Sequence, residues 1–349
     1  MSSSAEQDQQ RLSDLNTWLA SISSPKLDIS SLRVASADAS FRRYFRIDES
    51  ANAANGAERQ SYIVMDAPQP QEDVRPFIKI AELFGGMHLT VPKVLAQDTE
   101  QGFLLLTDLG TTMYSHVLNL DTAHKLYMDA IDSLVLLQSQ SQPDVLPEYN
   151  REFLHRELMI FPEWYINKHL GVTLNDEQTA SLNKVFDAIL ANVVAQPQVF
   201  VHRDYHSRNL MVTDKGNPGI IDFQGARYGP MTYDVVSLLR DAYVQWDEEM
   251  VLDWAIRYWE KAKKAGLPVA PDIDSFYRDF EFMGLQRHLK ILGIFARLAH
   301  RDGKQHYLAD MPTVMDYVRK TANRYSVLIP LLRLLDVIED TAPKFGYTF

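Results

Sequence analysis

The sequence predicts an α+β protein of two lobes, in which a small antiparallel β-sheet precedes a larger, mainly helical lobe. At 349 residues the chain is more than twice the length of a typical domain. From about residue 32 to 107, short strand-forming runs alternate with turns. Beyond Asp108-Leu109-Gly110, apolar residues recur at helical spacing over long stretches. We therefore expect an N-terminal lobe of residues 1–107 and a C-terminal lobe of residues 108–349.

The expected N-terminal lobe has one helix before its strands and a second helix among them. Apolar residues at helical spacing predict a first short helix at Leu12, Leu15, Trp18 and Leu19. A second helix is expected from about Val74 to Phe84. The predicted strands are Ser31–Val34, Phe41–Ile47, Ser61–Met65, Lys93–Gln97 and Phe103–Thr107.

The C-terminal lobe is expected to be helical except at one β-hairpin. Two apolar runs, Leu210–Thr213 and Gly219–Ile221, flank a turn of Asp, Gly, Asn and Pro residues. Because antiparallel pairing returns the chain to its starting end, Asn209 before the hairpin and Asp222 after it are expected close together. The helical periodicities cover about residues 114–140, 151–168, 176–194, 232–264, 273–300 and 311–337.

Composition excludes several classes of function. The 35 Lys and Arg against 46 Asp and Glu give a formal net charge of −11, the wrong sign for binding nucleic acid or an anionic membrane. The absence of cysteine excludes disulfides, thiolate zinc sites and thiol nucleophiles. The N-terminus lacks the pattern of a signal peptide, and no run approaches 18 apolar residues. We expect a cytoplasmic protein with a small-molecule partner; the oligomeric state is not predicted.

The stretch with the most chemical information is His202-Arg203-Asp204-Tyr205-His206-Ser207-Arg208-Asn209, followed by Asp222-Phe223 after the hairpin. Mg²⁺ prefers carboxylate and amide oxygens completed by water and phosphates, so Asn209 and Asp222 are expected to hold Mg²⁺. Asp204 then remains to accept a proton from a substrate hydroxyl. This order matches the H-R-D-x-x-x-x-N and Asp-Phe pattern of phosphoryl-transfer enzymes. The sequence therefore predicts ATP-dependent phosphoryl transfer with Asp204 as the catalytic base.

Two other interpretations of these residues stay open. His202 and His206 are four residues apart, and on a helix they would share a face with Asp204 nearby, as in a zinc site. The strand pattern and the basic neighbours favour a loop instead. In the second interpretation, Asp204 and Asp222 only cap turns. We expect His202 to be a packed residue of the loop, whereas His206 and Arg208 are candidates for substrate contact.

The motif His-x-Asp-x-His-x-x-Asn at 202–209, the later Ile221-Asp222-Phe223 and Tyr233-Asp234 resemble the aminoglycoside phosphotransferase and small-molecule kinase family. The resemblance extends over most of the chain. It implies a bilobal protein-kinase-like fold that uses ATP and Mg²⁺. It also implies that Asp234 is structural, because the matching aspartate of the family supports the catalytic loop.

The same resemblance assigns the nucleotide site to the N-terminal lobe. Leu104–Gly110 resembles the hinge whose backbone binds adenine, which implicates Thr107, Asp108 and Leu109; the alternative is a core strand that ends in a turn. The sequence departs from the family at two places. The expected phosphate loop, which includes Ser40, has no glycine, and the strand 61–66 has no phosphate-binding lysine. Arg43 or Arg46 is expected to replace that lysine; Arg42 and Arg46 share one strand face and Arg43 lies on the other.

Three segments resemble one branch of the family, the bacterial kinases that phosphorylate the anomeric C1 hydroxyl of N-acetylmuramate and N-acetylglucosamine during cell-wall recycling. The segments are Ala39–Arg46, Val64–Pro68 and Met283–Arg297. The resemblance implies one or both of these amino sugars as substrate. The same residues also suit an aminoglycoside or choline kinase, since the catalytic loop fixes the reaction and not the acceptor. The missing lysine and glycines leave a nucleotide-binding scaffold without turnover as a further alternative.

Residues 282–301 give a clue to the acceptor. Arg287, Lys290, Arg297 and Arg301 cluster on one helical face, where an arginine would pair with the lactyl carboxylate of N-acetylmuramate and repel a polycationic aminoglycoside. The alternative is a solvated helix face. Arg287 and its neighbour His288 are candidate substrate contacts. Aromatic residues that would stack on a sugar ring, or simply fill the core, are Trp164, Tyr165, Tyr243 and Trp246.

Overall fold

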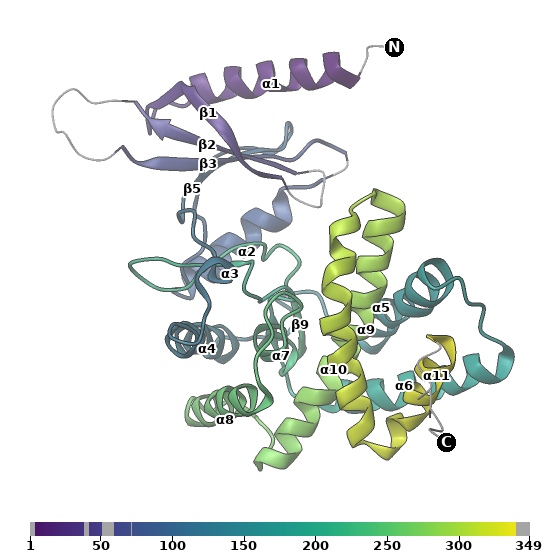
Figure 1. Cartoon of the computed structure of the whole chain (residues 1–349). Coiled ribbons are helices and arrows are strands. Elements are labelled where there is room, and N and C mark those ends of the chain that lie inside the picture. The colour runs from purple at the N-terminus through teal and green to yellow at the C-terminus, as the bar shows by residue number, and fades with distance from the viewer. Residues whose placement is uncertain (1–3, 38–41, 51–58, 71, 340–349) are drawn as a thin grey trace. The chain divides into compact units, whose positions relative to one another are not determined.

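The computed structural model describes residues 4–37, 42–50, 59–70 and 72–339. The chain forms two units, a small one built on an antiparallel sheet and a larger helical one (Figure 1), which confirms the predicted fold class. The first unit comprises residues 1–112 and 211–224, and the second comprises residues 113–210 and 225–349. The hairpin that we expected in the C-terminal lobe therefore belongs to the first unit, and the division falls after residue 112 rather than after residue 107.

The first unit is built on a five-stranded antiparallel sheet with the strand order β1-β2-β3-β5-β4. All five predicted strands are present, although β1 begins earlier than expected and Phe41 lies outside the described residues. Every pair of neighbouring strands in this order is antiparallel. The strands are β1 (Leu27–Ala37), β2 (Arg43–Glu49), β3 (Ser61–Asp66), β4 (Val94–Asp98) and β5 (Phe103–Thr107).

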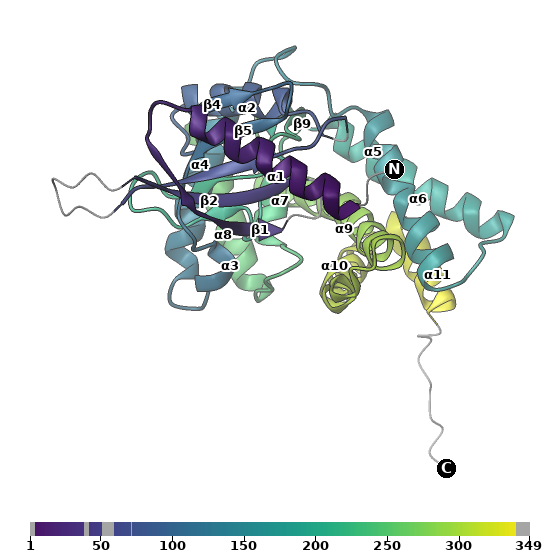
Figure 2. The ribbon, with the colours of Figure 1, turned by 90° about the horizontal axis from the view of Figure 1, so that it is seen from above.

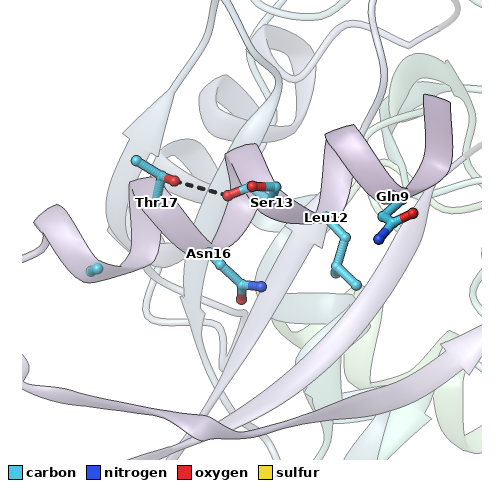
Figure 3. Close-up of a pocket in the computed structure, with 6 residues that line it drawn as sticks. Gln9, Leu12, Ser13, Asn16 and Thr17 are labelled. Carbon is cyan, nitrogen blue, oxygen red and sulfur yellow. Dashed lines mark hydrogen bonds between the residues drawn. The ribbon is translucent and has the colours of Figure 1, made fainter. Parts of the chain in front are cut away.

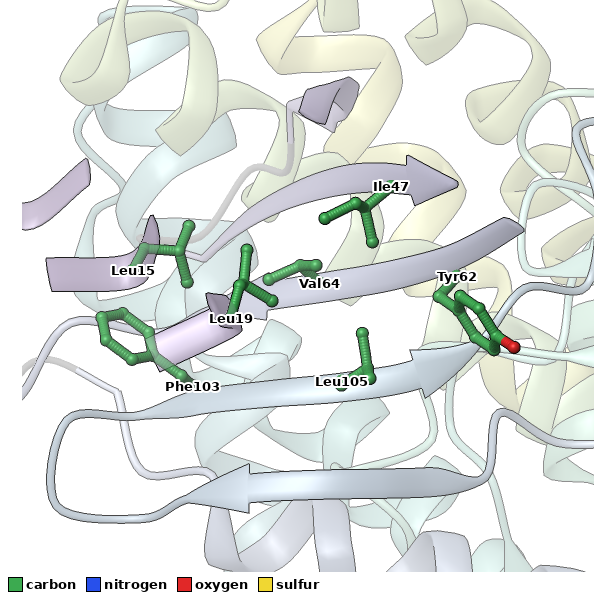
Figure 4. Packing of buried hydrophobic residues seen from close by; sticks show 7 residues of the cluster. All are labelled: Leu15, Leu19, Ile47, Tyr62, Val64, Phe103 and Leu105. Atoms are coloured by element: carbon green, nitrogen blue, oxygen red, sulfur yellow. The ribbon is translucent and has the colours of Figure 1, made fainter. Parts of the chain in front are cut away.

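Two helices cover the two faces of this sheet (Figures 1 and 2). On one face, α1 (Ser4–Ser21) packs Leu15 and Leu19 against the sheet, so the predicted first helix is longer than expected. The residues that form this core are Leu15, Leu19, Ile47, Tyr62, Val64, Phe103 and Leu105 (Figure 4). On the other face lies α2 (Arg75–Gly86), which has a proline in its first turn and buries Phe77 and Phe84.

The hairpin is joined to the first unit by contacts from residues distant in sequence. Gly219 forms an isolated bridge with Thr90, and the Ile220 amide donates to the Thr90 carbonyl at 2.7 Å. At the far end of the hairpin, the Phe223 ring packs on Phe77 of α2, with 4.8 Å between ring centroids. The hairpin strands are β7 (Leu210–Met211) and β8 (Gly219–Ile220). These contacts explain why the sequence, read along the chain, assigns the hairpin to the wrong unit.

A surface hollow of about 500 Å³ runs along α1 in the first unit (Figure 3). It contains no titratable side chain. Its lining residues are Gln9, Leu12, Ser13, Asn16, Thr17 and Ala20. The hollow therefore has no group for acid–base chemistry, and a catalytic base must be sought elsewhere.

The second unit is helical with one short strand pair, β6 (Gln198–Val201) with β9 (Arg227–Pro230). Four of the six predicted long helices are each broken into shorter ones. One break is an Asx turn, in which Asn119 Oδ1 accepts from the amides of Asp121 and Thr122. The helices are α3 (Tyr114–Val117), α4 (Ala123–Ser139), α5 (Arg151–Leu158), η1 (Phe161–His169), α6 (Asp176–Ala195), α7 (Tyr233–Leu239), α8 (Glu248–Lys264), α9 (Ile273–Asp302), η2 (Gln305–Asp310), α10 (Met311–Arg324), η3 (Ser326–Leu328) and α11 (Ile329–Ile338).

Helix α9 is the central element of the second unit. It begins at Asp272, whose side chain caps the Ser275 amide, and ends at Gly303 in the left-handed region. It packs against η1, α10, α7 and α6, so side chains on several of its faces are buried. At Gly293 a Cβ would lie 2.6 Å from the backbone of Ile160, so only glycine permits this close approach. Across the described part of the chain, no helix has both the length and the apolar character needed to cross a bilayer.

Candidate active site

The segment from His202 to Asn209 is a loop between β6 and β7, as the strand pattern predicts and not the helix that a zinc site would need. The backbone of Arg203 is left-handed, with φ of 80°. Asp234 holds this strained turn: its carboxylate accepts from the amides of His202 at 2.6 Å and Arg203 at 3.0 Å. Asp234 is fully buried, and burial raises its pKa to about 7, although the two amides favour the charged form.

A second buried carboxylate, Asp241, holds the other half of the loop. It accepts hydrogen bonds from both the amide and the hydroxyl of Ser207, and from the Tyr243 amide at 3.1 Å. Asp241 is 1% exposed. Our sequence analysis did not single it out. Asp241 follows the mainly apolar run Val235–Leu239 by two residues, which suggests that it is buried, and a buried carboxylate usually has a hydrogen-bond partner.

The candidate base Asp204 lies at the centre of the loop, and its side chain is 44% exposed. Partial burial of the Asp204 carboxyl group opposes its ionisation. The positive charges of Lys290 and Arg287 outweigh that effect and lower the pKa of Asp204 to about 2. A guanidinium nitrogen of Arg287 lies 3.9 Å from Asp204 Oδ1. Asp204 is therefore ionised and accessible at neutral pH.

Beneath Asp204 lies a buried polar cluster of Glu157, Arg203, Tyr233, Arg287 and Lys290. Glu157 accepts from Arg203 at 2.6 Å and lies 3.6 Å from Lys290 Nζ, which donates to the Tyr233 hydroxyl at 2.6 Å. Arg287 donates to the Arg203 carbonyl at 3.1 Å. Burial raises the pKa of Glu157, but Lys290 and Arg203 together lower it below its ordinary value. The cluster fixes the backbone next to Asp204 and supplies positive charge.

Two of the predicted residues of α9 thus have defined positions. Arg287 and Lys290 are 3% and 4% exposed, so the alternative of a solvated face is wrong for these residues. His288 is fully buried, with Nε2 at 3.0 Å from the Arg240 carbonyl and its ring stacked on Tyr317. Burial lowers the pKa of His288 to about 3. A residue enclosed in this way has no route to a substrate, and we do not carry it forward as a sugar contact.

Asn209 is fixed beside Asp204. Its amide nitrogen donates to the Asp204 carbonyl at 2.9 Å, and its backbone amide donates to the His206 carbonyl at 2.9 Å. His206 is half-buried, and burial lowers its pKa, so it is neutral at pH 7. Fully buried His202 accepts from the Asp204 amide at Nδ1. Among the described residues no group of three or more His, Asp or Glu side chains could hold a metal ion by itself, which leaves the zinc interpretation without support.

Arg208 and Tyr243 form a stacked pair at the edge of the loop, in which Arg208 is exposed and Tyr243 is half-buried. The Arg208 guanidinium lies over the Tyr243 ring, 3.5 Å from its centroid, and the His206 ring meets Tyr243 edge-on at 5.4 Å. Tyr243 also contacts Phe295 of α9. Trp246 and Tyr165 are packing residues, because Trp246 contacts a core tyrosine and a core tryptophan, and the Tyr165 ring stacks on buried Phe161. Of the four predicted aromatic candidates, Tyr243 is the one that joins the residues of the loop.

Asp222 follows the hairpin of the first unit and has a left-handed backbone, with φ of 63°. Its side chain is 38% exposed, accepts from the Gln224 amide at 2.7 Å, and lies 3.9 Å from a guanidinium nitrogen of Arg42. Arg42 also lies 3.8 Å from Glu72. Arg42 is therefore the arginine of this strand region that the structure brings to Asp222.

The two arginines that we expected to replace the lysine have other partners. Arg43 donates two hydrogen bonds to buried Asp66, and Arg46 donates two to Asp108. Their strand alternation is as expected, but each has an acidic partner: Asp66 lies opposite Arg43 on β3, and Asp108 follows β5. Ser40, the predicted phosphate-loop residue, lies outside the described residues.

The predicted hinge follows β5. The side chains of Thr107 and Asp108 are engaged internally: Thr107 accepts from the Lys93 amide at 2.9 Å, and Asp108 accepts from Arg46, Ser61 and the Gly110 amide. Burial opposes ionisation of Asp108, but these hydrogen bonds lower its pKa overall. The Leu109 side chain approaches Gly219 so closely that a Cβ there would be 3.0 Å away. Only the backbone of this segment remains to meet an adenine, as the hinge interpretation requires.

Amide and carboxylate oxygens suit Mg²⁺. Asn209 has a side-chain amide oxygen, and Asp222 supplies an accessible carboxylate. Hard oxygen donors of this kind are the usual partners of Mg²⁺ with phosphates, and they are a poor set for Zn²⁺. The donor chemistry of the two residues therefore fits the metal that the motif predicts.

Comparison with known sequences gives consistent matches over most of the chain. Residues 31–268 match the model of the phosphotransferase enzyme family. A protein of Neisseria meningitidis named N-acetylmuramate/N-acetylglucosamine kinase is 47% identical, over 97% of this chain and 100% of its own length. Proteins of the same name from Pseudomonas aeruginosa and Caulobacter vibrioides are 46% and 29% identical, over 94% and 80% of this chain and 97% and 85% of theirs.

Solved structures resemble the fold at much lower identity. An ADP-bound aminoglycoside phosphotransferase has a TM-score of 0.55 at 17% identity and covers 90% of this chain and 99% of its own. An ethanolamine kinase from Plasmodium vivax has a TM-score of 0.60 at 12% identity, with 83% of each chain covered. These likenesses establish the fold, which is that of aminoglycoside phosphotransferases and related kinases.

Proposed function

This chain belongs to the phosphotransferase enzyme family and is a kinase, and from that premise we propose that it transfers the γ-phosphoryl group of ATP to the anomeric C1 hydroxyl of N-acetylmuramate and N-acetylglucosamine. The observation that carries the choice of substrate is the 47% identity to a kinase of that name over almost the whole of both chains. Such a product would be a sugar 1-phosphate, suited to the recycling of cell-wall sugars. ATP is a cytoplasmic metabolite, which supports a cytoplasmic location.

We assign the chemical roles from the loop outward. Asp204 accepts a hydrogen bond from the sugar hydroxyl and then its proton, because it is the exposed carboxylate of the catalytic loop. Asn209 and Asp222 would hold Mg²⁺, which neutralises charge on the phosphates when bound. We assign phosphate binding to Arg42, in place of Arg43 and Arg46, because Arg42 lies beside Asp222 and the other two are committed to Asp66 and Asp108.

A carboxylate with a pKa of about 2 is a weak base, and this suits the reaction. Phosphoryl transfer proceeds through a loose transition state in which the nucleophile keeps its proton until late, so orientation matters more than basicity. An anomeric hydroxyl is also more acidic than an ordinary sugar alcohol. Asp204, held in place by the loop and by Arg287, is positioned for this task.

The charge around Asp204 separates the amino sugar from the aminoglycoside alternative. Arg208, Arg287 and Lys290 all lie close enough to influence the loop residues electrostatically. A polycationic acceptor would be repelled by these three cations, whereas an N-acetylated sugar carries no positive charge. The choline-type alternative is disfavoured for the same reason, because choline is a cation. The scaffold alternative does not hold for a member of a family of curated kinases.

The test is an acceptor panel scored by ADP formation. Purified protein with ATP and Mg²⁺ is supplied separately with N-acetylmuramate, N-acetylglucosamine, choline, ethanolamine and kanamycin. We expect ADP formation with the two N-acetylated sugars at least a hundredfold above the others. Turnover of kanamycin or choline with neither sugar active would overturn the proposal while leaving the kinase fold in place.

A further inference from the structure

One cation of the second unit has so far been given only a general electrostatic role. Arg208 lies in the catalytic loop between His206 and Asn209, four residues after Asp204. It is exposed, and among the residues that the structure describes it has neither a hydrogen bond nor an ion pair. Arg287 and Lys290, by contrast, are buried and use their hydrogen bonds within the protein. Arg208 is thus an exposed positive charge on the catalytic loop with its hydrogen-bond donors unused.

The position of Arg208 is nevertheless fixed. Its guanidinium lies 3.5 Å from the centroid of the Tyr243 ring. Tyr243 is itself held in place, because its backbone amide donates a hydrogen bond to buried Asp241 and its ring contacts Phe295. A stacked guanidinium keeps its N–H groups in the plane parallel to the ring, where they point outward. This arrangement presents a preorganised fork of the kind that binds a carboxylate through two parallel hydrogen bonds.

The nearby acidic residue does not neutralise this fork. Arg208 and Asp310, at the end of η2, influence each other electrostatically, but no ion pair joins them. Asp310 is half-buried, and burial raises its pKa despite the opposing effect of Arg208. Asp204, on the same loop, is already balanced by Arg287 and Lys290. The exposed edge of the loop therefore carries an unneutralised positive charge, four residues along the chain from the base.

We propose that Arg208 binds the lactyl carboxylate of N-acetylmuramate and so determines how well this sugar competes with N-acetylglucosamine. The inference rests on the function proposed above, which provides both sugars as acceptors. The two sugars differ in one respect that concerns Arg208: N-acetylmuramate carries an anionic lactyl ether on O3, and N-acetylglucosamine carries a hydroxyl. With C1 at Asp204, the O3 substituent is separated from the reacting hydroxyl by one ring carbon, and Arg208 is on the same loop as the base.

The experiment compares the kcat/KM values for the two sugars in wild-type, Arg208→Gln and Arg208→Lys proteins. A charge-assisted pair is worth about 1.5–3 kcal/mol, so we expect Arg208→Gln to lower the ratio of kcat/KM for N-acetylmuramate to that for N-acetylglucosamine by about 10- to 100-fold. Arg208→Lys should give a smaller fall, because lysine keeps the charge but not the planar fork. The matched control is Arg257→Gln, an exposed arginine of α8 paired with Asp253.

A second probe removes the charge from the sugar and leaves the enzyme intact. The methyl ester of N-acetylmuramate should be a poorer substrate than the acid for the wild-type protein. For Arg208→Gln the acid and the ester should react alike, since the interaction that separates them is gone. This comparison does not depend on whether the substitution weakens the stacking on Tyr243.

The outcomes separate the two proposals. An equal fall for both sugars in Arg208→Gln, or an unchanged ratio, would overturn the role of Arg208 and leave the proposed function standing. Wild-type turnover of N-acetylglucosamine without turnover of N-acetylmuramate would also overturn it. Failure of the wild-type protein to phosphorylate either sugar would instead contradict the proposed function.

Discussion

At Asp204, charge decides the chemistry more than burial does. Burial by itself would raise the pKa of this carboxylate, yet Lys290 and Arg287 lower it to about 2. The two cations belong to α9 and are themselves buried among tyrosines and Glu157. The base is therefore held ionised by groups that do not need to touch the substrate.

This balance leads to a pH prediction. In the wild-type protein Asp204 stays ionised, so it should cause no acid limb in kcat/KM above about pH 4. Lys290→Gln removes the first of the cations that lower the pKa of Asp204, so that pKa should rise, by about one unit or more. The acid limb should then move toward neutral pH, measured as kcat/KM between pH 4 and 9.

Lys261→Gln is the matched control, because Lys261 is a surface lysine of α8 that pairs with Asp132. Its profile should follow that of the wild-type protein. If the Lys290→Gln protein is folded by circular dichroism and its pH profile has the same acid side as that of the wild-type protein, the electrostatic role of Lys290 is refuted.

Asp222 offers a test of the metal assignment at the level of one residue. Its left-handed backbone is tolerated by asparagine, so Asp222→Asn removes the charge with little backbone strain. We expect Mg²⁺-dependent turnover to fall at least a hundredfold with an unchanged fold. Asp214→Asn, an exposed residue of the same hairpin, should remain active. Near-normal activity of Asp222→Asn would contradict the assignment.

How far individual residues could be predicted depends on whether their partners are local. The spacing of Asp204, Asn209 and Asp222 follows from one loop and one hairpin, and the sequence alone proposes their roles. The choice of Arg42 over Arg43 and Arg46 could not be predicted in this way. It depends on carboxylates at positions 66, 108 and 222, which adjacent strands and the distant hairpin bring to each arginine.

Among the elements, the catalytic loop depends on two buried carboxylates supplied by and just after α7. Asp234 holds the first half and Asp241 the second half. The resemblance to the family predicted Asp234, but Asp241 lies where a continuous helix over 232–264 was expected. The helix ends at Leu239 instead, and this break is what frees the Asp241 side chain to reach Ser207.

Loss of Asp241 should therefore loosen the loop. Asp241→Ala leaves the amide and hydroxyl of Ser207 buried without an acceptor, and we expect about 3 kcal/mol of destabilisation and a lower kcat. Ser207→Ala removes the hydroxyl donor alone, so it should cost about 1 kcal/mol. Urea unfolding of both variants measures the difference. Equal stabilities would show that Asp241 does not support the loop.

The packing of α1 on the sheet should contribute to the stability of the first unit. Leu15 is fully buried between α1 and the strands. Leu15→Ala should destabilise the first unit by about 3 kcal/mol through lost burial and a residual cavity. Leu12→Ala, at an exposed position on the same helix, should change the unfolding free energy by less than about 1 kcal/mol. Equal effects in urea unfolding would contradict the packing of α1.

For the whole molecule, the order of strands and helices was predictable and their grouping was only partly so. Hydrophobic periodicity and turn-forming residues are properties of neighbouring positions in the sequence. They predict all five strands of the sheet and the change to helices beyond it. The hairpin joins the first unit through Thr90 and Phe77, more than 100 residues away in sequence. No local pattern records such a contact, and the same limit explains the breaks in four predicted helices.

We propose that the molecule as a whole is a kinase for the anomeric hydroxyl of an N-acetylated amino sugar. The most direct test is ³¹P NMR of the product formed from ATP, Mg²⁺ and N-acetylmuramate or N-acetylglucosamine, with Asp204→Asn as the control protein. We predict a new sugar 1-phosphate signal, coupled to the anomeric proton, that is absent with Asp204→Asn. A signal from a phosphate on another hydroxyl, or no sugar phosphate from folded wild-type protein, would contradict the claim.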